Sequence, residues 1–130
     1  MPAVRILVVE DDAIIAFCLQ GTLIDSGYDV VGPVASGEEA IQKASKQRPD
    51  LVLMDVNLAG ELNGVEAAAQ IQAQLGIPVI YLTGYTEDVL QQGARMAGPY
   101  AYLSKPVHER ELCTTIEMML NRHEVKKRGR

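Results

Sequence analysis

Five polar residues that could do chemistry stand at the ends of short apolar runs of the chain. Glu10 and Asp11 follow "RILVV", Asp55 ends "LVLMD", Thr83 ends "VIYLT" and Lys105 follows "YAYLS". Carboxylates are the oxygen ligands that hard divalent cations prefer, and a carboxylate can also act as a nucleophile. An ammonium group and a hydroxyl group can bind phosphoryl oxygens. These residue types are therefore suited to holding a metal ion together with a phosphoryl group.

The apolar runs predict the elements that must position these residues. They predict β-strands at 4–9, 29–34, 51–55, 79–83 and 100–104. Helical patterns between and after them predict helices at about 12–26, 36–47, 64–75, 86–96 and 107–124. Alternating strands and helices, with strands that are apolar almost throughout, are typical of a parallel sheet covered on both faces. Because five strands are few for a closed barrel, we expect one open, doubly wound α/β sheet, (βα)5, of flavodoxin-like order 2-1-3-4-5.

In such a sheet, ligands bind beyond the carboxyl ends of the strands, where the strand order reverses. The first and third strands are neighbours in this order, so Glu10, Asp11 and Asp55 should meet. Two carboxylates about 5 Å apart repel each other by roughly 3 kcal/mol at an effective dielectric constant near 20. Three of them would recruit a cation, and Mg²⁺ suits a site with few carboxylates and several waters. Asp55 could then act as a nucleophile toward a phosphoryl group, with Lys105 and Thr83 holding the remaining oxygens.

Each of these residues also has a simpler explanation when it is taken alone. Asp12 is well placed as the N-cap of the first helix, and Asp55 could start a turn. Thr83 is a β-branched residue of a strand, Lys105 with the following proline could be a loop, and Tyr102 could be a half-buried strand residue. None of these explanations accounts for the convergence of several carboxylates, a hydroxyl and an ammonium on one edge.

Four motifs carry a resemblance to a known family. In this order and spacing, "ILVVEDD", "LVLMDVNLAG", "YLTGY" and "YLSKP" resemble the receiver domain of bacterial two-component response regulators. The resemblance covers residue 4 to about residue 122. It implies that Asp55 accepts a phosphoryl group from a sensor histidine kinase or a histidine phosphotransfer protein, with Mg²⁺ required. It also implies a switch of the face built from the fourth helix, the fifth strand and the fifth helix.

The resemblance assigns roles to individual residues. It implies metal ligation by Glu10, Asp11, Asp55 and Asn57. It implies phosphoryl binding by Thr83 and Lys105, an activation switch through Thr83 and Tyr102, and a cis peptide bond before Pro106. The chain departs from the family pattern in "NLAGELNG", which lacks a proline and is one residue longer. Glu10 in place of aspartate suggests a water-mediated metal contact, and we hypothesise that Tyr85 slows hydrolysis of the phosphoaspartate.

Length and composition are those of a single globular domain of 130 residues. We expect a receiver domain at 1–122 and a basic tail or start of a linker at 123–130. The chain has no apolar run of 18 or more residues and no signal peptide, so we expect a cytoplasmic protein with no membrane contact. The body is acidic, and we therefore expect no direct binding of nucleic acid. Two cysteines in helical patterns do not indicate a disulfide or a zinc site.

Several alternatives stay open at this point. We expect no enzyme activity beyond the domain's own phosphorylation and dephosphorylation. The alternatives are a Mg²⁺-dependent phosphatase with an aspartyl nucleophile and a receiver-like interaction module that is never phosphorylated. A homodimer, a missing output domain and a stand-alone regulator are equally open. The first helix is apolar almost all round, and Ile14 and Phe17 either dock the phosphotransfer helices of a kinase or serve ordinary packing.

Overall fold

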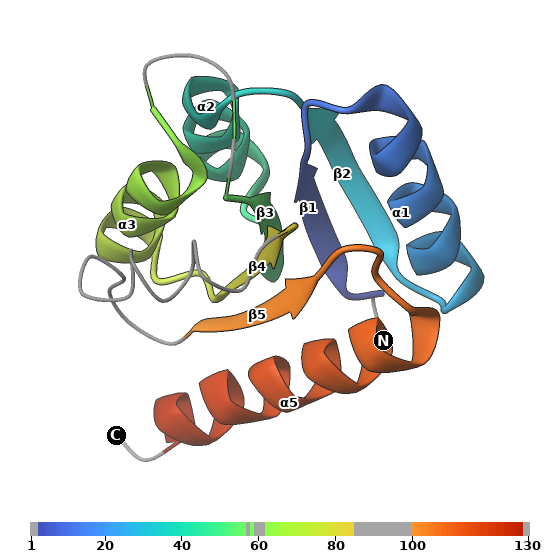
Figure 1. Cartoon of the computed structure of the whole chain (residues 1–130). Coiled ribbons are helices and arrows are strands. Elements are labelled where there is room, and N and C mark those ends of the chain that lie inside the picture. Colours follow the sequence, from blue (N-terminus) through green and yellow to red (C-terminus); the bar gives the residue numbers. More distant parts are fainter. Residues whose placement is uncertain (1–2, 57, 59–61, 85–99, 129–130) are drawn as a thin grey trace.

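The protein is a five-stranded parallel sheet with helices on both faces (Figure 1). The computed structural model describes residues 3–56, 58, 62–84 and 100–128, with the backbone alone for residue 100 and residues 122–128. The elements are β1 (Arg5–Val9), α1 (Ala13–Asp25), β2 (Asp29–Val34), α2 (Gly37–Gln47), β3 (Leu51–Asp55), α3 (Gly64–Leu75), β4 (Val79–Thr83), β5 (Tyr100–Ser104) and α5 (Glu109–Arg128). The strand order β2-β1-β3-β4-β5 confirms the predicted doubly wound topology. The helix expected at 86–96 lies outside the described residues.

The strands are apolar throughout because successive residues point to opposite faces of the sheet and both faces are covered. On one face, Leu7 of β1 and Met54 of β3 pack in a cluster with the buried side of α2 and α3. On the other face, Val8 and Leu53 pack in a second cluster with α1 and α5. Figure 1 shows α2 and α3 on one side of the sheet and α1 and α5 on the other. Burial on both faces makes the central strands a rigid support for whatever follows them.

Capping side chains set the starts of three helices. Asp12 is the N-cap of α1 and accepts hydrogen bonds from the backbone N–H groups of Ile14 and Ile15, at 2.9 and 3.1 Å. Ser36 accepts a hydrogen bond from the backbone N–H of Glu39 at the start of α2. Asn63 and Glu66 form a complete capping box at the start of α3. The simpler explanation of Asp12 as a cap is thus confirmed.

The last helix is longer than predicted. We expected it to end near residue 124, and instead the backbone of α5 is helical to Arg128. Lys and Arg are good helix formers, and their positive charges interact favourably with the C-terminal end of a helix dipole. The segment predicted as a basic tail is therefore helical as far as it is described. Within the described residues, none of the helices has both the length and the apolar character that a membrane span requires.

Candidate metal and phosphoryl site at the carboxyl edge of the sheet

The parallel strands bring the predicted site residues to one edge of the sheet. Glu10 and Asp11 follow β1, Asp55 ends β3, Thr83 ends β4, and Lys105 follows β5. Since β1, β3, β4 and β5 are successive neighbours in the sheet, residues from four separate stretches of sequence lie side by side. The geometry therefore brings together the carboxylates, the hydroxyl residue and the ammonium that the sequence placed at strand ends.

Three carboxylates form a compact cluster. One oxygen from each of Glu10, Asp11 and Asp55 lies within 4.8 Å of the others. Glu10 and Asp55 are each only 3% exposed, whereas Asp11 is exposed. This donor set fits Mg²⁺, a hard cation that binds a few carboxylates and keeps several waters, which the exposed side at Asp11 could admit. The buried pair supplies the rigid part of the site, and the exposed carboxylate faces its entrance.

Lys105 reaches back into this cluster. Its Nζ lies 2.7 Å from Glu10 Oε1 and 3.4 Å from Asp55 Oδ1. The backbone N–H of Lys105 donates to the carbonyl of Thr83 at 2.8 Å, which fastens the end of β5 to the end of β4. The following peptide bond, Lys105–Pro106, is cis, as the resemblance implied. In this structure the lysine therefore pairs mainly with Glu10, and Asp55 is its more distant partner.

Burial and charge shift two pKa values in the cluster. Burial is the main cause that raises the pKa of Glu10 above 4.5, and its hydrogen bond with Asp55 adds to the shift, although Lys105 opposes it. Burial lowers the pKa of Lys105, but the combined effect of Glu10 and Asp55 is larger, so its pKa is raised above 10.5. The ammonium of Lys105 therefore stays charged at neutral pH and can stabilise negative charge on the two carboxylates that it contacts.

Thr83 and Tyr102 share one face of the sheet. Tyr81 of β4 pairs with Tyr102 of β5, and Thr83 stands two residues beyond Tyr81 on the same strand, so all three side chains point the same way. Thr83 is fully buried, whereas Tyr102 is 43% exposed. Thr83, which is buried, and the exposed ring of Tyr102 thus lie on the same face of two neighbouring strands.

Two residues singled out from the sequence, Asn57 and Tyr85, lie outside the described residues. Residues that support the site without belonging to it were missed at the level of sequence. The capping box of Asn63 with Glu66 shows the spacing of three residues that indicates a helix start, so it could have been found. The close approach of Gly64 to the backbone of Asp55 has no local sequence signal beyond the glycine itself.

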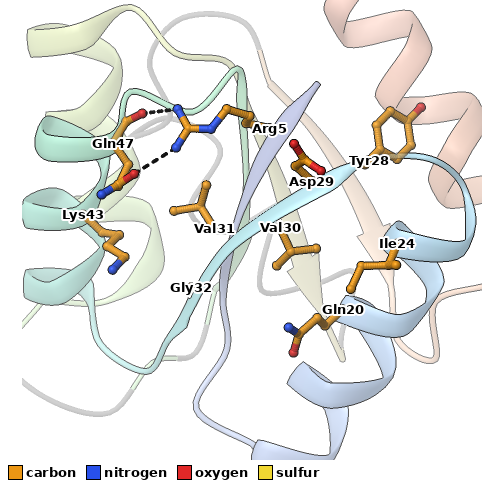
Figure 2. Close-up of a pocket in the computed structure, with 10 residues that line it drawn as sticks. All are labelled: Arg5, Gln20, Ile24, Tyr28, Asp29, Val30, Val31, Gly32, Lys43 and Gln47. Carbon is orange, nitrogen blue, oxygen red and sulfur yellow. Dashed lines mark hydrogen bonds between the residues drawn. The ribbon is translucent and has the colours of Figure 1, made fainter. Parts of the chain in front are cut away.

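A hollow of the molecule lies away from this edge. It is a groove of about 620 Å³ beside the outer edge of β2, between α1 and α2 (Figure 2). The guanidinium group of Arg5 donates there to the backbone carbonyl of Gln47 and, at 2.9 Å, to its side-chain oxygen. Asp29 is exposed and Lys43 is half-buried. Of these three charged groups, that of Arg5 is bonded to the protein, and those of Asp29 and Lys43 are at least partly exposed to solvent.

Comparisons with known proteins agree with the geometry. The family model described as "Response regulator receiver domain" matches residues 6–117. The transcriptional regulatory protein PdtaR of Mycobacterium tuberculosis is 37% identical over 118 residues, which are 91% of this chain and 57% of that protein. PhoP, the alkaline phosphatase synthesis transcriptional regulatory protein of Bacillus subtilis, is 37% identical over 122 residues, 93% of this chain and 50% of that protein. The chain spans about half the length of these curated relatives.

A solved structure is similar over nearly the whole length of both chains. The signal receiver domain of a modulated diguanylate cyclase from Desulfovibrio desulfuricans G20 matches with a TM-score of 0.88 and 36% identity, covering 96% of this chain and 99% of that chain. The chemotaxis protein CheY4 of Vibrio cholerae matches with a TM-score of 0.79 and 30% identity, covering 91% and 99%. Each similarity covers more than nine tenths of this chain.

Proposed function

Because this chain belongs to the response regulator receiver domain family of two-component systems, we propose that Asp55 accepts a phosphoryl group in a Mg²⁺-dependent reaction. The donor is the phosphohistidine of a sensor histidine kinase or of a histidine phosphotransfer protein. A carboxylate oxygen of Asp55 attacks phosphorus, the P–N bond to histidine breaks, and the departing imidazole nitrogen takes up a proton. The single observation that carries the proposal is the cluster of Glu10, Asp11 and Asp55, in which the ammonium of Lys105 contacts Glu10 and Asp55.

The proposed roles follow from position and charge. Asp55 is nearly fully buried at the end of a central strand, so its carboxylate is held in one place for the attack. Glu10 and Asp11 would hold Mg²⁺ together with Asp55, and Asn57 is assigned a backbone ligand by family likeness. When bound, the cation neutralises negative charge on the phosphoryl oxygens and on the carboxylates around them. Lys105 can move from Glu10 to a phosphoryl oxygen, since its Nζ already lies 3.4 Å from Asp55.

The proposed switch uses Thr83 and Tyr102. A phosphoryl group on Asp55 would attract the hydroxyl of Thr83, whose strand neighbours that of Asp55. Movement of Thr83 would free space on the face that Tyr102 shares, and the exposed ring of Tyr102 could turn inward to fill it. The outcome would be a changed surface around β5 and α5, together with the segment assigned to the fourth helix.

The exposed face of α1 supports a docking role for the phosphodonor. Ile14 and Phe17 are 77% and 76% exposed, large values for apolar side chains, and Ile14 stands two residues after Asp12, the last of the three acids. We therefore propose that Ile14 and Phe17 contact the phosphotransfer helices of the kinase. Ile14→Asp should slow transfer from a kinase found by phosphotransfer profiling and leave uptake from acetyl phosphate unchanged. Met118→Asp, at an exposed apolar residue of α5, is the matched control, and equal transfer rates in both variants would refute the docking role.

The main test is incubation with acetyl phosphate and Mg²⁺, followed by intact mass spectrometry. The wild-type protein should gain one phosphoryl group, and Asp55→Ala should gain none. Asp25→Ala, which removes an exposed carboxylate at the end of α1, should behave as the wild type. Uptake by Asp55→Ala, or no uptake by the wild type, would refute the proposal. In the same preparation, millimolar Mg²⁺ should raise the Tm by ligand linkage.

We propose no catalytic activity on other substrates. Repeated release of phosphate from a phosphomonoester would instead favour the phosphatase alternative. Since the chain matches only 57% and 50% of these two relatives, the proposal covers the receiver function alone, and an output domain and a homodimer remain proposals for the whole protein. Tyr85→Ala should shorten the lifetime of the phosphoaspartate if the ring of Tyr85 slows hydrolysis. An unchanged lifetime would refute that hypothesis.

A further inference from the structure

The first residue of α3, Gly64, lies directly against the backbone of Asp55. A Cβ atom added to Gly64 would lie 2.0 Å from the carbonyl oxygen of Asp55, 2.9 Å from its carbonyl carbon and 3.0 Å from Cα of Val56. All three are backbone atoms, which cannot rotate out of the way as a side chain could. A side chain at this position would therefore require α3 and the end of β3 to move apart.

Hydrogen bonds fasten both sides of this contact. The backbone N–H of Gly64 donates to the carbonyl of Val56 at 3.1 Å, and the N–H of Val56 donates to the carbonyl of Leu82 on β4 at 3.0 Å. The capping box of Asn63 with Glu66 holds the first turn of α3 in register, with bonds of 2.9 and 3.2 Å. The end of β3 is thus held between β4 and the first turn of α3.

The helix α2 supports the same turn from the other side. Glu38 accepts a hydrogen bond from the backbone N–H of Leu62 at 3.2 Å. A Cβ atom added to Gly37 would lie 3.0 Å from both Cβ and the carbonyl oxygen of Leu62. The chain that returns from the site to α3 is therefore closely packed from Leu62 to Gly64, and it has little room to yield.

We propose that Gly64 is a positioning residue for phosphoryl transfer, because the absence of its side chain lets α3 hold the backbone of Asp55 at the depth where its carboxylate meets Glu10 and Asp11. This inference rests on the proposed function of Asp55. Helix propensity alone favours alanine over glycine, so propensity does not explain a glycine here. A displacement of about 1 Å in a reacting group can lower a rate by about 100-fold.

The test compares Gly64→Ala with its parent in a stabilised background, Gly21→Ala. Gly21 lies on α1 with open space around it, so alanine there should raise the Tm by about 3 °C. The rate of phosphorylation is measured over a range of acetyl phosphate concentrations at saturating Mg²⁺, below both Tm values. The double variant should show a limiting rate at least about tenfold lower than Gly21→Ala and a weaker rise of Tm with Mg²⁺. Limiting rates that agree within about twofold would overturn the inference.

Failure of this inference and failure of the proposed function give different results. If Gly21→Ala itself takes up no phosphate, the proposed function fails, and the crystal structure of the double variant then decides on Gly64. A shift of the Asp55 backbone relative to β4 supports the positioning role, and an unshifted backbone overturns it.

A milder pair of variants tests the same contact if the double variant does not fold. Glu38 is exposed, so Glu38→Ala should fold, and it removes the acceptor for the N–H of Leu62. We expect a limiting rate about threefold lower, a milder effect than that of Gly64→Ala, because the turn loses one of its hydrogen bonds and can shift slightly. Glu38→Gln keeps an acceptor oxygen and loses the same charge, so it should restore the rate. Equal rates in both variants would count against the packed turn as a positioning device.

Discussion

The carboxyl edge of the sheet and the groove beside β2 both gather charged side chains, but they hold them in different ways. At the carboxyl edge, Glu10 and Asp55 are almost fully buried and both contact the ammonium of Lys105. In the groove, the guanidinium of Arg5 is already bonded to Gln47, and the other charges have access to water (Figure 2). Desolvated charges interact strongly and are costly when unpaired, whereas solvated charges are screened.

The difference shows why the size of a hollow does not identify the site. The groove has a volume of about 620 Å³, within the usual range for ligand pockets. In the groove, however, the guanidinium of Arg5 is bonded to Gln47, Asp29 is exposed and Lys43 is only half-buried, so these charges are less desolvated than Glu10 and Asp55. At the carboxyl edge, the described residues include a cluster of three carboxylates, and the ammonium of Lys105 contacts two of them. The remaining negative charge is what a divalent cation would neutralise.

The largest expected effect is on the free energy of unfolding, and it is measured by comparing the loss of a lysine from each region. Lys105→Ala leaves Glu10 and Asp55 buried without their ammonium and should lower the free energy of unfolding by about 2 kcal/mol at pH 7. The loss is below that of a fully buried pair because the side chain of Lys105 is 22% exposed. Lys43→Ala, in the groove, should change the same free energy by less than about 0.5 kcal/mol. Urea denaturation with a chelator present measures both.

Adding Mg²⁺ should distinguish the two lysine variants further. Because the cation can replace the missing ammonium, it should raise the Tm of Lys105→Ala more than the Tm of the wild type. It should leave the effect of Lys43→Ala unchanged. Similar losses of stability in the two lysine variants would mean that the edge is solvated like the groove.

A loss of stability of intermediate size is expected at Asp12, which we assign to helix capping, unlike Glu10 and Asp11, which we assign to the metal site. Asp12 caps α1 through the N–H groups of Ile14 and Ile15, so Asp12→Ala should lower the free energy of unfolding by about 1 kcal/mol. Asp12→Asn keeps a capping oxygen and should recover most of that loss. Thermal melts with and without Mg²⁺ should show the same Mg²⁺-induced rise in Tm for both variants as for the wild type. A weaker rise would place Asp12 in the metal site.

The smallest expected effect is on the free energy of unfolding at alkaline pH, and it comes from Tyr28 in the groove. Burial raises the pKa of Tyr28 above 10.0, with smaller contributions from Cys113 and Glu117. The folded state then keeps the phenol proton where the unfolded state has begun to lose it. The stability from this group is therefore complete below pH 10 and is lost as the pH rises through the folded-state pKa. Tyr28→Phe should flatten this part of the curve of unfolding free energy against pH, and an unchanged slope would contradict the shift.

Much of the fold follows from local patterns. A parallel strand buried on both faces must be apolar at successive positions, so the runs at 51–55 and 79–83 could be identified as strands without a structure. Topology then predicted that Asp11, Asp55 and Lys105 would meet, because parallel strands end at one edge. The described structure confirms this meeting.

Only the tertiary structure decided how these groups pair and what holds them. By itself the sequence determined which residues stand at strand ends and that Asp12 and Ser36 cap the first two helices, because these features depend on neighbours a few positions away. It did not determine that Lys105 lies closer to Glu10 than to Asp55, or that Gly64 rests on the Asp55 carbonyl. Those contacts depend on shifts of about an ångström between packed elements, which arise from the sum of many side-chain volumes in the core.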